Sequence, residues 1–110
     1  MPYIAAVETV VETSAYLAAA HEAGMSDAER AAAVDLVSAN PVVGDLIIGT
    51  GGCRKVRLAG KGRGKSGGYR LITFYKVGER VFLLTVFSKG DRANLTQAER
   101  NGLKKLTGML

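Results

Sequence analysis

The stretch "CRKVRLAGKGRGKSGGYRLITFYKVGERVFLLTVFSK", residues 53–89, contains three runs that read as β-strands, at 53–58, 69–76 and 80–89. These runs are rich in Val, Ile, Phe, Tyr and Thr, which favour strands. The "VGE" at 77–79 is short enough for a hairpin turn. Because short connections join antiparallel neighbours, the runs predict an antiparallel sheet. Their nearly continuous apolar character predicts that helices cover one face of that sheet.

The chain before this sheet begins with a short apolar run at 2–7. A run of that length fits either a strand or the start of a helix, and we assign it to a first strand. From Thr9 onward, the apolar residues recur at helical spacing up to Gly24, a residue type that commonly follows the last turn of a helix. The pattern predicts a first helix between these two residues.

A second helix is predicted by Ser26 and Glu29, which form the S-x-x-E pattern of a capping box. The helix should end at Asn40 and Pro41, because the residue before a proline is disfavoured in the helical conformation. Its apolar stripe is expected to consist of Ala32, Val34, Leu36 and Val37. Together, the two helices form a hairpin that must cover the sheet.

Thr96 and Glu99 form another capping box and predict a C-terminal helix starting with "QAERNGLKKL". The expected order is strand, helix, helix, three strands, helix. The 110 residues are enough for one domain, spanning 1–110, that buries a core without disulfides or a structural metal. We therefore predict an α+β fold, with a small antiparallel-rich sheet, an N-terminal helical hairpin packed on it and a C-terminal helix.

Charge is distributed unevenly along the chain. Residues 1–53 contain one basic and seven acidic residues, a formal charge of −6. Residues 54–92 contain eleven basic and two acidic residues, a charge of +9, and the rest of the chain brings the total to +5. Such a field concentrates polyanions, of which RNA and DNA are the commonest. An anionic membrane would favour a basic amphipathic helix, whereas these charges lie between strands, so we expect no membrane partner.

Strand alternation in "CRKVRL" sends Lys55 and Arg57 to one face and Val56 and Leu58 to the other. Two neighbouring like charges reduce the stability of a sheet unless solvent or an anion accepts them. A charged loop can also serve only to protect a sheet edge. Protection of an edge needs charged side chains but not charges of one sign. The stretch from residue 54 to Arg70 contains basic residues and no acidic one, which favours an anionic partner.

Other familiar sites are not indicated. His21 has no second ligand at metal-binding spacing, and Cys53 has no partner histidine, so we expect no metal, no cofactor and no nucleophilic thiol. A nucleotide-binding P-loop would need glycine at Ala59. One cysteine forms no internal disulfide, and Glu8 and Glu12 interrupt the apolar N-terminal stretch, so we expect a cytoplasmic protein without a signal peptide.

Four segments in order, "GTGGCRKVR", "GKGRGKSGGYR", "LLTVFSK" and "LTQAERNGLKKL", resemble the HigB-type branch of the RelE/HigB superfamily of bacterial type II toxins. The resemblance covers about residues 26–106. It implies a RelE-like fold and a metal-independent, ribosome-dependent endoribonuclease that cuts mRNA in the A site of the 30S subunit. It also implies a cognate antitoxin, of the helix-turn-helix type. In such enzymes the ribose 2′-hydroxyl attacks the adjacent phosphate.

By position, the resemblance implies that Lys55 and Arg70 clamp the phosphate and that Lys89 donates the proton to the leaving group. Arg57 stands where the RelE pattern has lysine. A guanidinium does not readily give up its proton, so Arg57 is expected to stabilise charge, and the general base falls to Lys55 or Lys65. The expected contacts to the RNA backbone come from Lys61, Arg63, Lys65 and Arg92.

The tyrosine that RelE-type toxins place near the C-terminus has no counterpart here after Tyr75. Asn94, Leu95 and Arg100 stand in that part of the chain instead. Two alternatives therefore stay open. One is a basic module that binds RNA or ribosomes without cutting, and the other is a weakened toxin whose main partner is its antitoxin.

Overall fold

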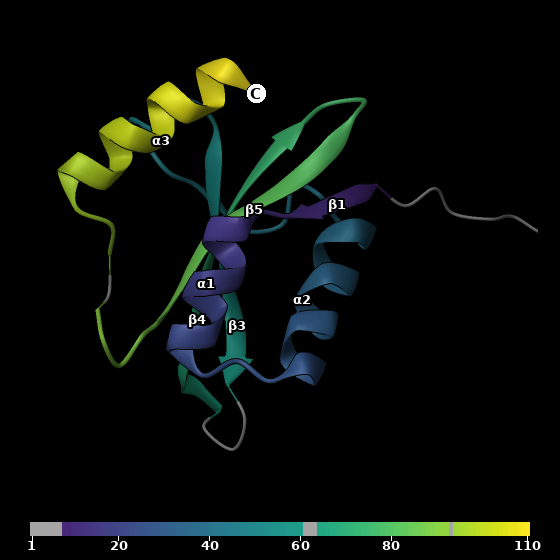
Figure 1. Ribbon diagram of the computed structural model, residues 1–110, viewed down its shortest axis with the longest axis vertical. Coiled ribbons are helices and arrows are strands. Elements are labelled where there is room, and N and C mark those ends of the chain that lie inside the picture. The colour runs from purple at the N-terminus through teal and green to yellow at the C-terminus, as the bar shows by residue number, and fades with distance from the viewer. Residues whose placement is uncertain (1–7, 61–63, 93) are drawn as a thin grey trace, which may run out of the picture.

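A computed structural model describes residues 8–60, 64–92 and 94–110. Its helices and strands form an α+β fold, as predicted, with a C-terminal helix (Figure 1). In chain order the elements are β1 (Thr9–Glu12), α1 (Ser14–Ala23), α2 (Asp27–Ala39), β2 (Asp45–Leu46), β3 (Cys53–Gly60), β4 (Gly64–Lys76), β5 (Arg80–Ser88) and α3 (Gln97–Met109).

One five-stranded sheet organises the molecule, in the order β1-β5-β4-β3-β2. All neighbours are antiparallel except β1, which runs parallel to β5. The predicted turn at 77–79 is confirmed, because the Glu79 amide donates a hydrogen bond of 2.9 Å to the Lys76 carbonyl and closes the β4–β5 hairpin. The strand β2 was not predicted, since two residues are too few to form a pattern.

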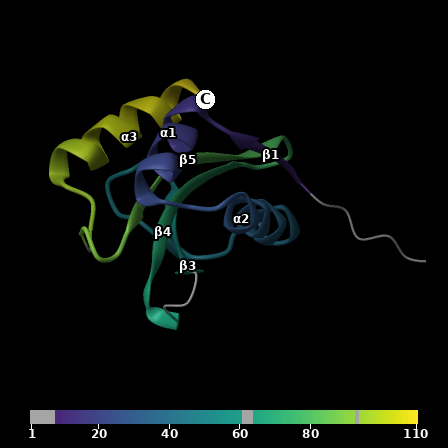
Figure 2. The ribbon, with the colours of Figure 1, turned by 60° about the horizontal axis from the view of Figure 1, so that its bottom comes forward.

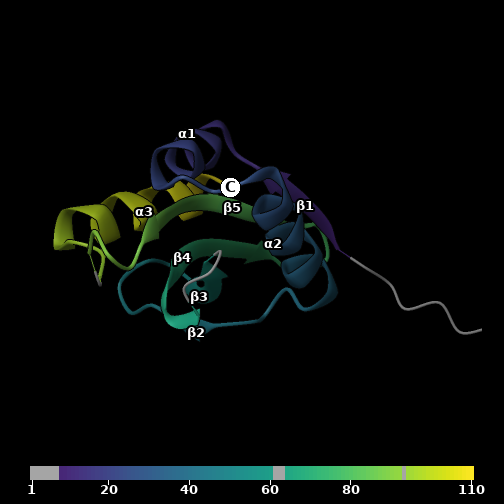
Figure 3. The ribbon, with the colours of Figure 1, turned by 90° about the horizontal axis from the view of Figure 1, so that it is seen from below.

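Helices lie on both faces of this sheet. The helical hairpin covers one face, as predicted, whereas the position of α3 on the other face was not predicted. The first hydrophobic cluster joins residues of α1 and α2 to Val56 and Leu71, and Figure 3 shows both helices on the same side of the sheet. The second cluster joins Leu103 and Leu106 of α3 to the opposite face, at Ile72. Alternation along β4 sends Leu71 and Ile72 to these two different cores.

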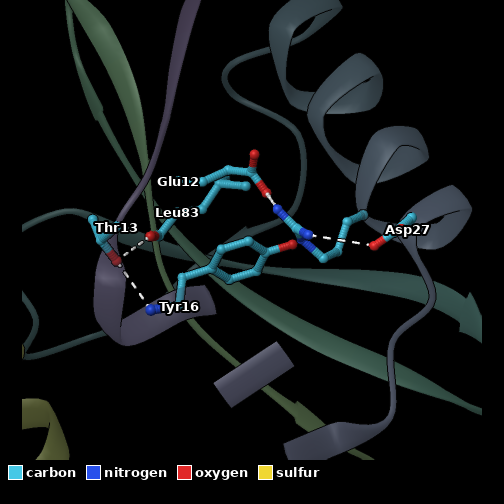
Figure 4. Close-up of polar contacts among 6 residues, drawn as sticks. Glu12, Thr13, Tyr16, Asp27 and Leu83 are labelled. Atoms are coloured by element: carbon cyan, nitrogen blue, oxygen red, sulfur yellow. Dashed lines mark hydrogen bonds and ion pairs between the residues drawn. The ribbon is translucent and has the colours of Figure 1, made fainter. Parts of the chain in front are cut away.

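The N-terminal segment differs from the prediction, because Val10 and Val11 belong to β1 and not to a helix. The first helix begins only at Ser14, capped by Thr13. The Thr13 hydroxyl oxygen accepts a hydrogen bond of 3.1 Å from the Tyr16 amide, and the hydroxyl donates one of 2.7 Å to the Leu83 carbonyl on β5 (Figure 4). Pairing with β5 thus overrides the helical spacing. The strand predicted at 2–7 lies outside the described residues.

The helix α2 confirms its predicted boundaries. Ser26 and Glu29 form a complete capping box, and Asn40 is the C-terminal cap. The apolar stripe is confirmed in part: the predicted Val37 is buried, together with Ala33, which was not predicted. The predicted Ala32 and Leu36 are exposed, Leu36 by 37%, and Val34 is partly buried against the core.

An ion pair ties α2 to β1. The Arg30 guanidinium lies 3.0 Å from the Glu12 carboxylate and 3.6 Å from that of Asp27, and Figure 4 shows Glu12 and Asp27 at the two ends of these contacts. The predicted end of α1 is confirmed at Gly24, whose φ of 79° is the left-handed conformation that glycine adopts without strain. The turn of the helical hairpin is therefore formed at Gly24, and an ion pair joins its second helix to β1.

The helix α3 confirms the second predicted capping box, formed by Thr96 and Glu99. Its far end is attached to the sheet, because the Thr107 hydroxyl donates a hydrogen bond of 3.0 Å to the Thr50 carbonyl, just before β3. Figures 1 and 2 show β4 crossing the sheet, with its first residues at the end of the molecule farthest from α3. The middle of β3 and β4 therefore lies between α3 and the opposite end of the molecule.

Candidate functional site

Three of the predicted cations lie together on β3 and β4. Arg57 of β3 is directly opposite Arg70 of β4, and Lys55 is opposite Ile72. Residues directly opposite each other in an antiparallel pair point to the same face. Lys55, Arg57 and Arg70 therefore share the face that carries α3, next to Cys53. Two guanidinium groups across one strand pair repel each other, so this arrangement favours a bound anion.

Arg70 is the most unusual of these cations because only 6% of it is exposed. Its guanidinium donates a hydrogen bond of 3.2 Å to the carbonyl of Tyr69. In the part of the chain that the structure describes, none of the ion pairs involves Arg70. Burial of a charge reduces stability unless the charge is paired. Arg70 is thus a buried cation for which the described residues supply no counter-charge.

Lys55 is joined to the segment between β5 and α3. Its ammonium group donates a hydrogen bond of 3.4 Å to the side-chain oxygen of Asn94. The bond is long and solvent-exposed, so it positions the lysine without holding it firmly. Because Asn94 follows β5 and Lys55 is on β3, this segment must reach across the sheet face beside the cations.

Lys89 directly follows β5, and its amide donates a hydrogen bond of 3.1 Å to the Gly68 carbonyl of β4. Its exposed position is thus next to the residues that precede Arg70. The glycine is required here, since its φ is 62° and a Cβ atom would lie 2.2 Å from the Leu58 carbonyl oxygen. The structure therefore brings all four predicted catalytic residues to one region of β3, β4 and the end of β5.

Arg92 lies near Lys55, Arg57 and Arg70, because it packs on the ring of Phe87. Its guanidinium carbon lies 4.4 Å from the centroid of Phe87, and Phe87 is directly opposite Arg70. Arg92 also forms a hydrogen-bonded ion pair with Glu99. This hydrogen bond is the main reason that the pKa of Glu99 is lowered from 4.5 to about 2. Sequence reasoning selected Arg92 for its charge alone and missed Phe87 and Glu99.

The remaining predicted RNA contacts fall in or near the hairpin tip. Lys61 and Arg63 lie outside the described residues, and Lys65 is near the start of β4. Arg54 faces away from the cluster, where its guanidinium donates a hydrogen bond of 3.1 Å to the Gly44 carbonyl.

Burial raises the pKa of the Cys53 thiol, which disfavours a nucleophilic thiolate. Across residues 8–60, 64–92 and 94–110, no three His, Cys, Asp or Glu side chains are grouped so that they could hold a metal ion. None of the helices described is both long and apolar enough to cross a membrane.

The fold and the site define a small α+β protein with a cationic sheet face suited to a polyanion. The model of the family described as the RelE toxin of the RelE / RelB toxin-antitoxin system matches residues 9–110. The chain belongs to this family. It is therefore a toxin of a toxin–antitoxin system, with an antitoxin as its partner, in a family whose toxins are generally endoribonucleases. The assignment to the HigB-type branch remains a prediction.

Proposed function

We propose that the protein is a metal-independent, ribosome-dependent endoribonuclease that cuts mRNA in the A site of the 30S subunit. Cutting the message inhibits translation and arrests growth. The observation that carries the proposal is the burial of Arg70 directly opposite Arg57, with no ion pair to Arg70 among the described residues. A phosphate diester at this position would supply the missing negative charge.

The reaction forms a bond between the 2′-oxygen and phosphorus and breaks the bond from phosphorus to the 5′-oxygen of the next nucleotide. Lys55 and Arg70 hold the phosphate, and Arg57 offsets the charge that grows in the transition state. Lys55 or Lys65 removes the proton of the 2′-hydroxyl. Lys89 returns a proton to the leaving 5′-oxygen. The ribose supplies the nucleophile, so the protein needs to provide only cations and position.

The surrounding charge supports binding of the message. We propose that Lys61, Arg63, Lys65 and Arg92 contact the RNA backbone, and that residues 1–110 act as a single toxin domain in the cytoplasm, where ribosomes are present. The antitoxin is proposed to be a helix-turn-helix protein. The basic segment of +9 attracts both ribosomal RNA and message over distances longer than a direct contact.

A second function is favoured by the lack of a tyrosine after Tyr75 and by the bond between Lys55 and Asn94. In that case the cationic face binds RNA or ribosomes without cutting, or cuts weakly, and the antitoxin is the main partner. RNA affinity would then fall with salt, with a log–log slope of about 0.7 per phosphate contact for single strands, and the RNA would be recovered intact.

Induced expression in a bacterial host tests the proposal. The wild-type protein should arrest growth and yield transcripts cut within codons, whereas Arg70→Ala and Lys89→Ala should abolish both effects. Loss of one transition-state contact typically lowers the rate by about 10²- to 10³-fold. Arg80→Ala, at the opposite end of β5, is the matched control and should remain toxic. Continued arrest by a folded Arg70→Ala, Lys89→Ala double variant would refute the site.

A further inference from the structure

The end of β5 and the start of α3 form a small stack of side chains. Phe87 lies at the bottom, the Arg92 guanidinium lies over its ring with 4.4 Å between the guanidinium carbon and the ring centroid, and Glu99 binds that guanidinium from the side. Phe87 is 6% exposed, whereas the Arg92 side chain keeps 36% of its surface exposed. Because the ring lies on one side of the guanidinium, a second flat group can stack only on the opposite side.

Arg92 also lines a hollow of about 440 Å³ between β5 and α1. The hollow is large enough for a nucleobase. Its lining includes the carboxyl-bearing residues Glu22 and Asp91, which repel a phosphate but accept hydrogen bonds from the amino groups of a base. Cations that suit a phosphate lie one strand away, at Arg70 on β4, and two strands away, at Arg57 on β3. The acidic hollow therefore suits a nucleobase, whereas the arginines on the neighbouring strands suit the phosphate of the RNA backbone.

We propose that a base of the bound message stacks on the outer face of the Arg92 guanidinium, with Phe87 beneath it and Glu99 as the positioning residue. This inference rests on the proposed function, since it names the part of the RNA that the same site recognises. Arginine planes are common stacking partners for unpaired bases in RNA. Neighbouring strands lie about 5 Å apart, so one nucleotide can reach both Arg92 and Arg70.

Glu99 fixes the orientation of the Arg92 guanidinium, because its carboxylate accepts two hydrogen bonds. Its carboxylate accepts a hydrogen bond of 2.8 Å from the Thr96 amide as part of the capping box, and it also binds Arg92. The guanidinium is therefore fixed to the rigid first turn of α3. A planar group held between a ring and a carboxylate loses little further freedom when a base stacks on it.

The test uses ribosome complexes carrying messages with one abasic nucleotide at each position of the A-site codon in turn. For the wild-type protein, removal of the stacked base should lower kcat/KM by about 5- to 150-fold at one position, the range expected for one lost stacking contact. Arg92→Lys keeps the positive charge but removes the planar guanidinium on which the base would stack. It should cut the intact message more slowly and show no further loss on the abasic one.

Three control variants complete the experiment. Glu99→Gln should reduce the abasic penalty, whereas Thr96→Ala, which loses the other half of the same capping box, should retain it in full. Arg80→Lys, at the far end of β5, should behave as wild type. A full abasic penalty in Arg92→Lys, or no penalty at any position in a cutting wild-type protein, would overturn the stacking alone. A wild-type protein that cuts no message would overturn the proposed function as well.

Discussion

The buried charge of Arg70 lowers the stability of the fold. Arg70 is buried opposite Arg57, and its hydrogen bond to Tyr69 satisfies only part of a guanidinium that has five donors. The like-charge pair is a local strain of a kind that proteins keep where function requires it. The same residue should therefore reduce stability and enable activity.

The substitution Arg70→Leu separates these two effects. Removal of a buried cation in favour of an apolar side chain should leave the melting temperature unchanged or raise it, because the repulsion with Arg57 disappears. Cleavage of ribosome-bound message should fall by about 10²- to 10³-fold. Thermal unfolding and cleavage are measured on the same preparation. A variant that loses stability but keeps its activity would show that Arg70 has a structural role only.

Glu99 makes the stability of the protein depend on pH in the acidic range. Its pKa is lowered from 4.5 to about 2 in the folded protein, so its contribution to stability is complete above pH 4.5 and is lost as the pH falls towards 2. Glu99→Gln should lower the free energy of unfolding at pH 7 by about 1 kcal/mol or less, because solvent screens a pair that is one-third exposed. The difference from wild type should shrink below pH 4.5. Urea unfolding at pH 7 and at pH 3 measures it, and an equal difference at both values would contradict the ion pair.

At the scale of elements, the three central strands, the turn at 77–79 and both capping boxes could be predicted from the sequence, because each depends on local pattern or on residues three apart. β1 could not. Val10 and Val11 fit a helix by spacing, and only the parallel partner β5 decides that they form a strand, with Val10 opposite Val81. The two covered faces also depend on long-range packing of α3.

The junction of β3 and β4 provides the sharpest test of the elements. Gly68→Ala would place a methyl group against the Leu58 carbonyl in a backbone that already has positive φ, and should lower stability by more than about 1 kcal/mol. It should also displace Lys89, whose amide binds Gly68. The control Gly78→Ala has a similar φ, of 80°, but open space, and should show the smaller loss. Chemical unfolding compares the two, and equal losses would argue against the tight approach of β3 and β4.

At the scale of the whole molecule, the sequence predicts which face of β3 carries the cations, but not which residues outside the strand contact them. Strand alternation places Lys55 and Arg57 on one face, and the register of β3 with β4 adds Arg70. The contacts Lys55–Asn94 and Arg92–Phe87 depend on how the segment between β5 and α3 crosses the sheet. Such a path has no repeating pattern, so residue spacing does not predict it.

The acidic N-terminal half and the basic second half place charges of opposite sign in different parts of the molecule. Residues 1–53, with a charge of −6, supply β1 and the helical hairpin on one face, whereas the cationic side chains Lys55, Arg57 and Arg70 are on the other. A polyanion is therefore directed to the face that carries the cation cluster. This orientation would place RNA on β3 and β4 before any specific contact forms.

The chemistry of the cut ends tests the central claim most directly. Ribosome complexes with defined messages are incubated with the wild-type protein and with Arg70→Leu, and both new ends are analysed. Attack by the 2′-hydroxyl predicts a 2′,3′-cyclic phosphate on the upstream fragment and a 5′-hydroxyl on the downstream one, within the A-site codon, and neither with the variant. Intact message on ribosomes that hold the wild-type protein, or fragments with a 5′-phosphate, would contradict the account.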